Sequence, residues 1–362
     1  MSTIVIAGSG KMARSIGTWL IDRNNEVIFY SRNEKRADDL RKYITRHVNR
    51  LQRYDPSASV KDPAFAHPES VSALVNCDII IESVEEGIEA KKAVISAIIQ
   101  RTGMPRLLLS NSSSILPSSI HDRCAGLHFF YPVQTARLVE CVVPATYGTI
   151  ERNALIEFVK DNCMDAIVQN EHNAFISNRL ILPLQNECFR LLSLGYDRSF
   201  VDRATVSCLN GIGILTAIDS IGPQTVLNAL IQYRSRMAPE EAGNFSYMHN
   251  GLETAIRRHV FPAAPAMKNP ESAKTYDNLP FHFLCLFITS CLYFLENGWV
   301  DSNNLDLLLD RVYGAEETLS DTVQKTGEDS IRAYIEEQLK STGIVYFRKI
   351  RSKPTELMGV NG

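Results

Sequence analysis

The sequence predicts a chain of two domains, an α/β domain with a doubly wound, mostly parallel sheet followed by an all-α domain. One observation is the length of 362 residues, which is long for a single hydrophobic core. Another is that short apolar runs alternate with helical patterns over the first part of the chain, whereas only helical periodicity continues beyond it. We place the two domains at residues 1–175 and 176–362.

Several short runs in the first domain have the features of buried parallel strands. They are β-branched or aromatic and end in polar or small residues, and helical patterns over 12–24, 34–53 and 88–101 lie between them. Such alternation indicates a parallel sheet with helices on both faces. The runs are TIVIA, EVIFY, DIIIES, RLLLSN and GLHFF.

The second domain contains a weak internal repeat. Residues 181–202 resemble residues 283–306, because each segment is an apolar helix that ends near a glycine, Gly195 or Gly298, before an aromatic residue and an acidic second helix. One inserted residue aligns them. We expect two copies of a helical unit, over about 176–235 and 280–335, that bury their apolar faces against each other. The alternative is a chance likeness between two amphipathic helices.

The composition is that of an ordinary globular protein and argues against several classes. A net charge of −3 gives no reason to expect nucleic-acid binding. The most apolar run, residues 281–295, is short for a membrane span and contains His282 and Thr289. We therefore expect a buried helix there and no association with a membrane.

The cysteines and the N-terminus bear on the cellular compartment. Eight scattered cysteines without a CxxC pair favour reduced, buried thiols over a metal site or a disulfide framework. The chain begins directly with a strand-like run instead of a basic and apolar leader. Both features predict a cytoplasmic protein without a bound metal.

The loop AGSGKMARSIG, residues 7–17, has the spacing of a dinucleotide-binding turn, with Ala13 in the third glycine position. It follows a predicted strand and opens a helix, so Gly8 can form the tight turn and Gly10 can let the backbone approach a pyrophosphate. A tight turn without a ligand is the alternative. We predict a Rossmann-type cofactor site that includes Gly8, Ser9, Gly10, Lys11 and Met12.

The end of the second predicted strand bears on the choice of cofactor. NAD-preferring sites place a carboxylate there, which binds the ribose 2′-hydroxyl. This chain has Ser31 and Arg32 instead, a hydroxyl and a guanidinium that suit a 2′-phosphate. We expect NADP(H) to be favoured over NAD(H), unless Arg32 merely begins a solvated helix.

Further segments carry residues suited to proton transfer. LLLSNSSS ends a strand with Asn111 and Ser113, His128 lies at a strand end with Glu140 twelve positions later, and Asn178 stands where the helical domain begins. Histidine can act as acid or base near neutral pH, and a carboxylate on its other ring nitrogen fixes its tautomer. A hydroxyl and an amide can hold a substrate oxygen. A lone histidine among apolar residues is more often a core residue, so His128 by itself does not indicate a catalytic site.

These segments resemble the motifs of the L-3-hydroxyacyl-CoA dehydrogenase family from residue 3 to about residue 230. GSGKMA resembles the family's GxGxMG turn, SNSSS its SNTSS, HFFYPVQTARLVE its HFFNPxxxxxLVE, and ISNRLILP its VNRLLxP. The resemblance implies that His128 is the general acid/base with Glu140 as its partner, and that Ser113 and Asn178 bind the substrate oxygen.

A further motif, DIIIESVEEGIEAKK, resembles the family's strand and helix after the third crossover. The resemblance places Glu86 and Lys91 at the nicotinamide-ribose site. We also include Asn111 among the expected cofactor-binding residues.

The chain departs from the family pattern at three places. Ser31 replaces the family's aspartate, which puts NAD preference in doubt, and Tyr131 replaces the asparagine of HFFNP. Residues 210–223 read NGIGILTAIDSIGP where the family has a GxPxGP stretch. We expect an altered pocket wall there.

The expected function is the interconversion of a 3-hydroxyacyl and a 3-oxoacyl thioester, carried on coenzyme A or on acyl carrier protein, as a biosynthetic reduction with NADP(H). One alternative is a dehydrogenase of a β-hydroxy acid that is not a thioester. Another is a dinucleotide-binding protein that has lost catalysis. The intact set of Ser113, His128, Glu140 and Asn178 argues against that last reading.

Two features bear on partners. Cations crowd the helix after Arg32, either as a solvated face or as a landing surface for the phosphates of coenzyme A or an acidic carrier protein. In single-copy family members the helical unit makes the dimer contact, so a second copy allows either a homodimer or a monomer with an internal pseudo-dimer. The cations are Arg41, Lys42, Arg46, Arg50 and Arg53.

Overall fold

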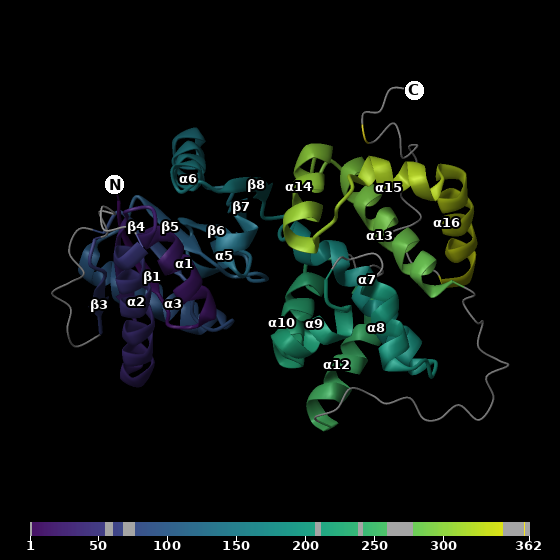
Figure 1. Cartoon of the computed structure of the whole chain (residues 1–362), viewed down its shortest axis with the longest axis horizontal. Helices are drawn as coiled ribbons and strands as arrows, with labels where there is room; N and C mark the ends of the chain where they lie inside the picture. Colours follow the sequence, from purple (N-terminus) through teal and green to yellow (C-terminus); the bar gives the residue numbers. More distant parts are fainter. Residues whose placement is uncertain are drawn as a thin grey trace. The chain divides into compact units, whose positions relative to one another are not determined.

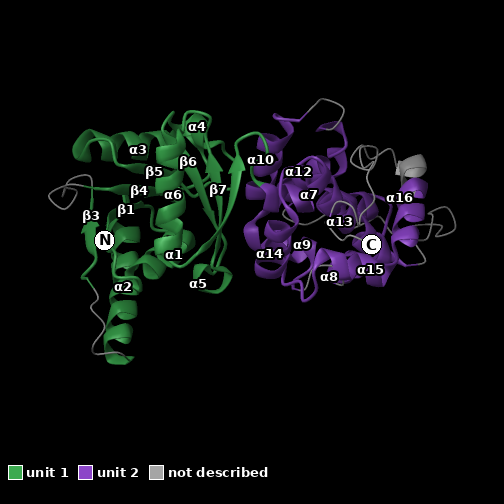
Figure 2. Cartoon of the chain, turned by 90° about the horizontal axis from the view of Figure 1, so that it is seen from above, with its two compact units in different colours: residues 1–175 green, residues 176–362 purple. Residues whose placement is uncertain are grey.

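The computed structural model describes residues 2–54, 61–67, 77–206, 211–237, 242–258, 278–342 and 358. The chain divides into two compact units, residues 1–175 and 176–362 (Figure 2). The two domains predicted from the sequence meet at the same residues. Each unit is described by itself below.

The first unit is built on one eight-stranded sheet with the order β3-β2-β1-β4-β5-β6-β7-β8. All neighbouring strands are parallel except β6 and β7, which are antiparallel. The strands are β1 (Thr3–Ala7), β2 (Glu26–Tyr30), β3 (Ala64–Ala66), β4 (Ile79–Glu82), β5 (Leu107–Ser110), β6 (Cys124–Phe129), β7 (Leu138–Val143) and β8 (Asp165–Asn170).

The five predicted strands are present as β1, β2, β4, β5 and β6. The other three were not predicted. β3 has only three residues, whereas β7 and β8 carry polar side chains inside apolar runs. The order reverses between β1 and β4, and doubly wound sheets bind their ligands beyond the carboxyl ends of the two strands at such a reversal.

Helices cover both faces of the sheet, as the sequence predicts (Figure 1). Ile4 and Ile6 of β1 face a core formed with α1, α2 and α6, and the alternate residues Val5 and Ala7 face a second core formed with α3 and α4. The helices are α1 (Lys11–Ile21), α2 (Glu34–Tyr54), α3 (Ile88–Thr102), α4 (Pro117–Ile120), α5 (Val133–Ala136) and α6 (Thr149–Asp161).

The second unit has no strand among its described residues, which confirms the prediction of an all-α domain. Its core contains the apolar faces of the long helices α7 and α13. The helices are α7 (Ile176–Ser193), α8 (Arg198–Val206), α9 (Ile214–Ile221), α10 (Pro223–Arg234), α12 (Ser246–Arg258), α13 (Leu279–Glu296), α14 (Ser302–Tyr313), α15 (Leu319–Thr326) and α16 (Glu328–Thr342).

Two sets of helices within this unit follow the same plan, α7 to α10 and α13 to α16. The first helix of each set is followed by a glycine with positive φ, Gly195 at 94° and Gly298 at 63°. In each set a later aspartate accepts a hydrogen bond from a backbone N–H 13 residues further on, at 2.7 Å for Asp202 and 2.8 Å for Asp306. The first helices, α7 and α13, pack against each other. These matches support the predicted repeat.

Helix α13 is long and apolar enough to cross a membrane by length and composition, and 78% of it is buried inside the second unit. His282 and Thr289 are among its buried residues. It is therefore a core helix of this unit, as expected from the run 281–295. Helices α9 and α10 are long and apolar enough to cross a membrane only if they are counted together as one segment, which is bent by 101°.

The cysteines follow the prediction with one exception. Seven described cysteines are free thiols, and six of them are buried, whereas Cys163 is exposed on the turn after α6. Burial raises the pKa of the Cys77 thiol to about 11 and that of the Cys141 thiol to about 12. Cys208 lies outside the described residues. No metal-binding group of His, Cys, Asp or Glu exists among the residues that the structure describes.

Candidate active site

The glycine turn lies at the carboxyl end of β1, where the strand order reverses between β1 and β4. Gly8 has a φ of 142°, and a Cβ there would lie 2.3 Å from the carbonyl oxygen of Ser83, so only glycine fits. A Cβ on Gly10 would meet no protein atom within 4 Å. Helix α1 then begins at Lys11 without a side-chain cap. The open space and the uncapped helix N-terminus suit the pyrophosphate of a dinucleotide.

The other predicted residues of the loop differ in their exposure. Lys11 is exposed, whereas Met12 packs against the core beneath the helix. Arg14 donates from Nε to the carbonyl of Ser9 at 3.3 Å, and its guanidinium carbon lies 5.4 Å from the centre of the Tyr43 ring. This contact ties the loop to α2.

At the end of β2, Ser31 is buried and its hydroxyl lies within the turn that leads to α2. Its Oγ donates to the carbonyl of Asn33 at 3.2 Å and accepts from the Asn33 N–H at 3.4 Å. Arg32 is exposed beside it. The strand therefore ends in a neutral hydroxyl and a solvent-facing cation, with no carboxylate at either position.

Lys91 lies in a buried ion cluster that the sequence analysis foresaw only in part. Its Nζ lies 3.0 and 3.1 Å from the two carboxylate oxygens of Glu82 and 3.1 Å from Glu86 Oε2. Burial alone would lower the pKa of Lys91, but the two carboxylates outweigh it and raise the pKa above its ordinary value. Glu82 is a residue that the sequence analysis missed. It ends the strand DIIIE, and a carboxylate at that position is the signal that could have found it.

The last three serines of SNSSS, residues 112–114, alternate between buried and half-buried positions. Ser112 and Ser114 are buried and donate hydrogen bonds to Glu86 Oε1, the latter at 2.8 Å. Burial raises the pKa of Glu86, and the charge of Lys91 together with these hydrogen bonds lowers it overall. Ser113, the predicted substrate ligand, lies between them and is half-buried.

Asn111 connects the ends of three strands. Its Oδ1 accepts from the Phe129 N–H at 3.1 Å, and its Nδ2 donates to Ser83 Oγ at 3.3 Å. Ser83 is the residue whose carbonyl faces Gly8. Asn111 therefore lies at the carboxyl edge of the sheet near the glycine turn, and its predicted role in cofactor binding stays a prediction.

His128 and Glu140 form a buried pair. They stand opposite each other in the antiparallel register of β6 and β7, and His128 Nδ1 lies 2.7 Å from Glu140 Oε2. The Glu140 side chain has no exposed surface, and the His128 side chain is 11% exposed. The rings of Phe130 and Phe175 lie 4.8 and 5.5 Å from the imidazole, measured between ring centres. With Nδ1 bound to the carboxylate, Nε2 is the nitrogen suited to proton transfer.

The second oxygen of Glu140 accepts a hydrogen bond from Gln169 Nε2 at 2.6 Å. Gln169 lies on β8 and was not predicted as a site residue. A polar side chain within the strand-like run AIVQ is the signal in the sequence that could have indicated it.

The connection between β6 and β7 is anchored to α1 by Gln134. Its Nε2 donates to Thr18 Oγ1 at 2.7 Å, and its Oε1 accepts from Ser15 Oγ at 3.0 Å. Tyr131, which stands where the family has asparagine, is 63% exposed in this connection. The anchor fixes the segment that follows His128.

Asn178, the other predicted ligand of the substrate oxygen, lies in the second unit, in the first turn of α7. The start of this helix is held by the second set of helices. The Tyr313 hydroxyl of α14 donates to the carbonyl of Ser177, and the Arg179 guanidinium carbon lies 4.3 Å from the centre of the Trp299 ring. The joint action of Asn178 and His128 stays a prediction.

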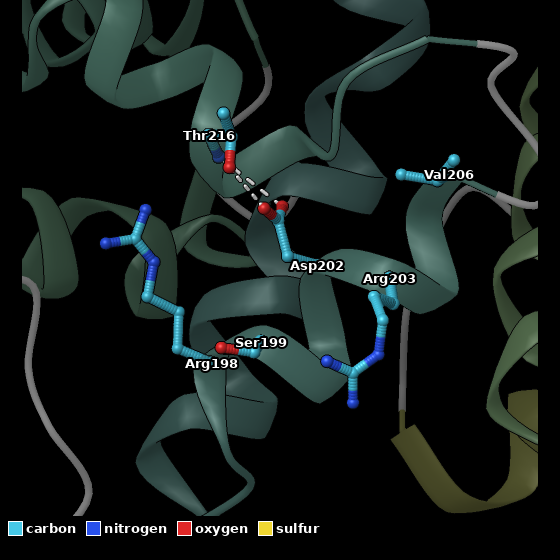
Figure 3. Close-up of a pocket in the computed structure, with 6 residues that line it drawn as sticks. All are labelled: Arg198, Ser199, Asp202, Arg203, Val206 and Thr216. Carbon is cyan, nitrogen blue, oxygen red and sulfur yellow. Dashed lines mark hydrogen bonds between the residues drawn. The ribbon is translucent and has the colours of Figure 1, made fainter.

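The second unit also has an open groove of about 460 Å³ (Figure 3). Asp202 points into it, but its carboxylate already binds Thr216 Oγ1 at 2.5 Å and the Leu215 N–H at 2.7 Å. Arg198 is paired with Asp219. No predicted site residue lines the groove, whose lining is Arg198, Ser199, Asp202, Arg203, Val206 and Thr216.

The reversal of strand order, the glycine turn and the buried His–Glu pair are together typical of a nicotinamide-dependent dehydrogenase. Residues 3–171 match the family model described as the NAD-binding domain of 3-hydroxyacyl-CoA dehydrogenase. This match covers the first unit, which therefore carries a nicotinamide-dinucleotide-binding domain similar to that of 3-hydroxyacyl-CoA dehydrogenases, and the chain is an NAD(P)-dependent oxidoreductase.

Proteins of similar sequence or structure include several named as 3-hydroxybutyryl-CoA dehydrogenases. The probable 3-hydroxybutyryl-CoA dehydrogenase of Bacillus subtilis (strain 168) is 25% identical over 242 residues, which are 63% of this chain and 83% of the relative. The solved 3-hydroxybutyryl-CoA dehydrogenase of Escherichia coli K12 has a TM-score of 0.72 at 18% identity, over 99% of this chain and 98% of that one. The (S)-3-hydroxybutyryl-CoA dehydrogenase of Ralstonia eutropha has a TM-score of 0.59 at 21% identity, over 74% of this chain and 100% of that one. The two structures share the fold.

Proposed function

We propose that this protein interconverts a 3-hydroxyacyl and a 3-oxoacyl thioester with NADP(H), and that it works in the direction of reduction. The observation that carries the proposal is the contact between His128 and Glu140, which fits an acid/base pair at the edge of a dinucleotide-binding sheet. The names of the Bacillus and Ralstonia relatives support the substrate class.

In this proposal His128 moves the proton. Glu140 holds Nδ1 and stabilises the imidazolium, so that Nε2 gives its proton to the carbonyl oxygen at C3 of the substrate during reduction. The nicotinamide, when bound, supplies the hydride to C3 and is oxidised. Ser113 and Asn178 hold the substrate oxygen through a hydroxyl and an amide. In the reverse direction His128 accepts the hydroxyl proton.

The preference for NADP(H) rests on the end of β2. A carboxylate there would repel a 2′-phosphate, and this chain has Ser31 with the exposed cation Arg32. Lys35 and Arg36 are exposed in the first turn of α2. The matching family model is described as an NAD-binding domain, which supports a nicotinamide dinucleotide of either kind.

The exposed cations on α2 favour an acyl carrier that bears negative charge. The helix buries Leu40, Ile44 and Val48, and cations occupy much of its exposed surface. We propose that this surface, formed by Arg41, Lys42, Arg46, Arg50 and Arg53, receives the phosphates of coenzyme A or an acidic carrier protein.

The proposal extends to assembly and compartment. Because α7 and α13 of the two helical sets pack on each other within one chain, we propose a monomer with an internal pseudo-dimer. The buried free thiols suit a reducing compartment, which we propose to be the cytoplasm.

The direct test is the oxidation of NADPH and NADH in the presence of acetoacetyl thioesters on coenzyme A and on carrier protein. We expect turnover with a higher kcat/KM for NADPH. Equal or better use of NADH would contradict the cofactor choice. Turnover of free 3-oxo acids without turnover of either thioester would contradict the substrate class.

A further inference from the structure

Strand β8 brings a neutral amide to the buried His128–Glu140 pair. In the parallel register of β7 and β8, Glu140 stands opposite Ile167, and Gln169 stands opposite Val142. Since side chains alternate along a strand, Gln169 shares a face of the sheet with Ile167. Its side chain reaches Glu140 Oε1 at 2.6 Å while His128 contacts Oε2.

Because the pair is buried, the hydrogen bond from Gln169 to Glu140 affects the charge state of the carboxylate. Glu140 has no exposed surface and Gln169 is 4% exposed, so the carboxylate must find its hydrogen-bond donors within the protein. A donor to one oxygen stabilises the ionised carboxylate, because hydrogen bonds to charged groups are stronger than those between neutral groups. Without this donor the carboxylate would be more easily protonated.

The type of donor also matters. A cation at position 169 would neutralise the charge of Glu140 and weaken its effect on the imidazole. An amide donates without a charge, so the full negative charge of the carboxylate continues to act on His128. The three strands β6, β7 and β8 thus bring imidazole, carboxylate and amide into contact with one another.

We propose that Gln169 is a positioning residue for proton transfer. Its amide keeps Glu140 ionised and oriented, and Glu140 in turn orients His128. The inference rests on the proposed function, in which His128 is the acid/base. In this inference Gln169 acts on the imidazole through Glu140.

The test compares two substitutions of nearly the same shape. Gln169→Met keeps the size and removes the donor, whereas Gln169→Glu donates to Glu140 only while its own carboxyl is protonated. We expect Gln169→Met to lower kcat for acetoacetyl-CoA reduction by about tenfold to a hundredfold at every pH, with an unchanged KM, because a hydrogen bond to a charged group is lost. Gln169→Glu should approach wild-type kcat at low pH and lose it as the pH rises.

Asn162→Leu is the matched control. Asn162 is also a buried amide of the first unit, and it bonds Asn25 Nδ2 at 2.7 Å and the Phe158 carbonyl at 2.8 Å, away from the pair. It should lower the melting temperature and leave the pH profile of kcat unchanged. A wild-type kcat and pH profile in both Gln169 variants would overturn the inference. If Gln169→Met does not fold, the pH dependence of kcat in Gln169→Glu tests the inference by itself.

A second readout separates this inference from the proposed function. Nitrogen NMR of the His128 ring, assigned by its loss in His128→Gln, reports the tautomer of the imidazole without any substrate. We expect the ring-nitrogen shifts to change in Gln169→Met and to stay unchanged in Asn162→Leu. Changed shifts in a protein that turns over no thioester would uphold the role of Gln169 and contradict the proposed function. Unchanged shifts would overturn the role of Gln169 whatever the activity.

Discussion

At the scale of single residues, the carboxyl edge of the sheet is organised by side chains that hold one another's charges. Lys91 lies between Glu82 and Glu86, and Ser110 donates to Glu82 at 2.6 Å. His128, Glu140 and Gln169 form a second chain of contacts on the neighbouring strands. Because every one of these charged groups has a partner of the right kind, the edge can remain charged although it is largely buried.

The two glycines of the turn allow a prediction at this scale. Gly8→Ala should destabilise the protein by roughly 1–3 kcal/mol or more, because the backbone is strained and the new Cβ would overlap the Ser83 carbonyl. Gly10→Ala, where a Cβ meets nothing within 4 Å, should fold with wild-type stability. It should still weaken NADPH binding by about tenfold or more, because the backbone must approach the pyrophosphate closely.

Urea unfolding and titration of NADPH fluorescence measure the two effects separately. Gly8→Ala with wild-type stability would contradict the account of the turn. NADPH affinity unaffected by Gly10→Ala would show that the ligand does not lie over this glycine.

At the scale of elements, the alternation of strands and helices made most of the first unit predictable. The motifs also indicated His128 and Glu140 as partners, but not how they meet. The α/β pattern predicts parallel neighbours, whereas β6 and β7 form an antiparallel pair, and only that register sets the two side chains opposite each other. Gln169 was missed for the same reason, because its role depends on β8 lying beside β7. The local sequence marks Gln169 as a polar residue within an apolar run, but it does not show which strand lies beside it.

The junction of α7, α13 and α16 provides a pH-dependent prediction. Glu187 of α7 binds His282 Nε2 at 2.8 Å and the Arg190 guanidinium at 2.6 and 2.7 Å, and Tyr334 of α16 contacts His282 Nδ1. Burial alone would raise the pKa of Glu187, but the hydrogen bonds from Arg190 and His282 lower it below the ordinary value of 4.5. The ionised carboxylate therefore stabilises the folded state above about pH 4.5, and this stabilisation is lost as the pH falls through the lowered pKa.

The comparison of wild type with Glu187→Gln tests this point. We expect the variant to be less stable near neutral pH by about 1–3 kcal/mol, as for a lost hydrogen bond to a charged group, and the difference to narrow in acid. Denaturant unfolding at a series of pH values measures it. A difference that is the same at every pH would contradict the assignment of the effect to the charge of Glu187.

At the scale of the whole molecule, the two sets of helices explain why the second half of the chain is longer than one helical unit requires. The glycines, the aspartates and the order of helices match between the sets. The sequence predicted this repeat only from the likeness between residues 181–202 and residues 283–306. Cap contacts between residues far apart, such as Asp306 with Leu319, became apparent only in the structure.

Sedimentation tests the consequence for assembly. If the packing of α7 on α13 replaces a contact between subunits, the protein should sediment as a monomer of 40.6 kDa at micromolar concentration. The mass should not change when NADPH is added. A species of twice that mass, stable on dilution, would contradict the internal pseudo-dimer.

The central claim is that His128 carries the proton of a hydride-transfer reaction, and the chain offers a matched control for it. His282 is likewise a buried histidine in contact with a carboxylate, at 2.8 Å against 2.7 Å for His128. The most direct measurement is kcat for acetoacetyl-CoA reduction by His128→Gln and His282→Gln. We expect a loss of about 10²- to 10⁴-fold for His128→Gln. For His282→Gln we expect a lower melting temperature with kcat near wild type. Wild-type turnover by His128→Gln, or an equal loss in both variants, would contradict the account.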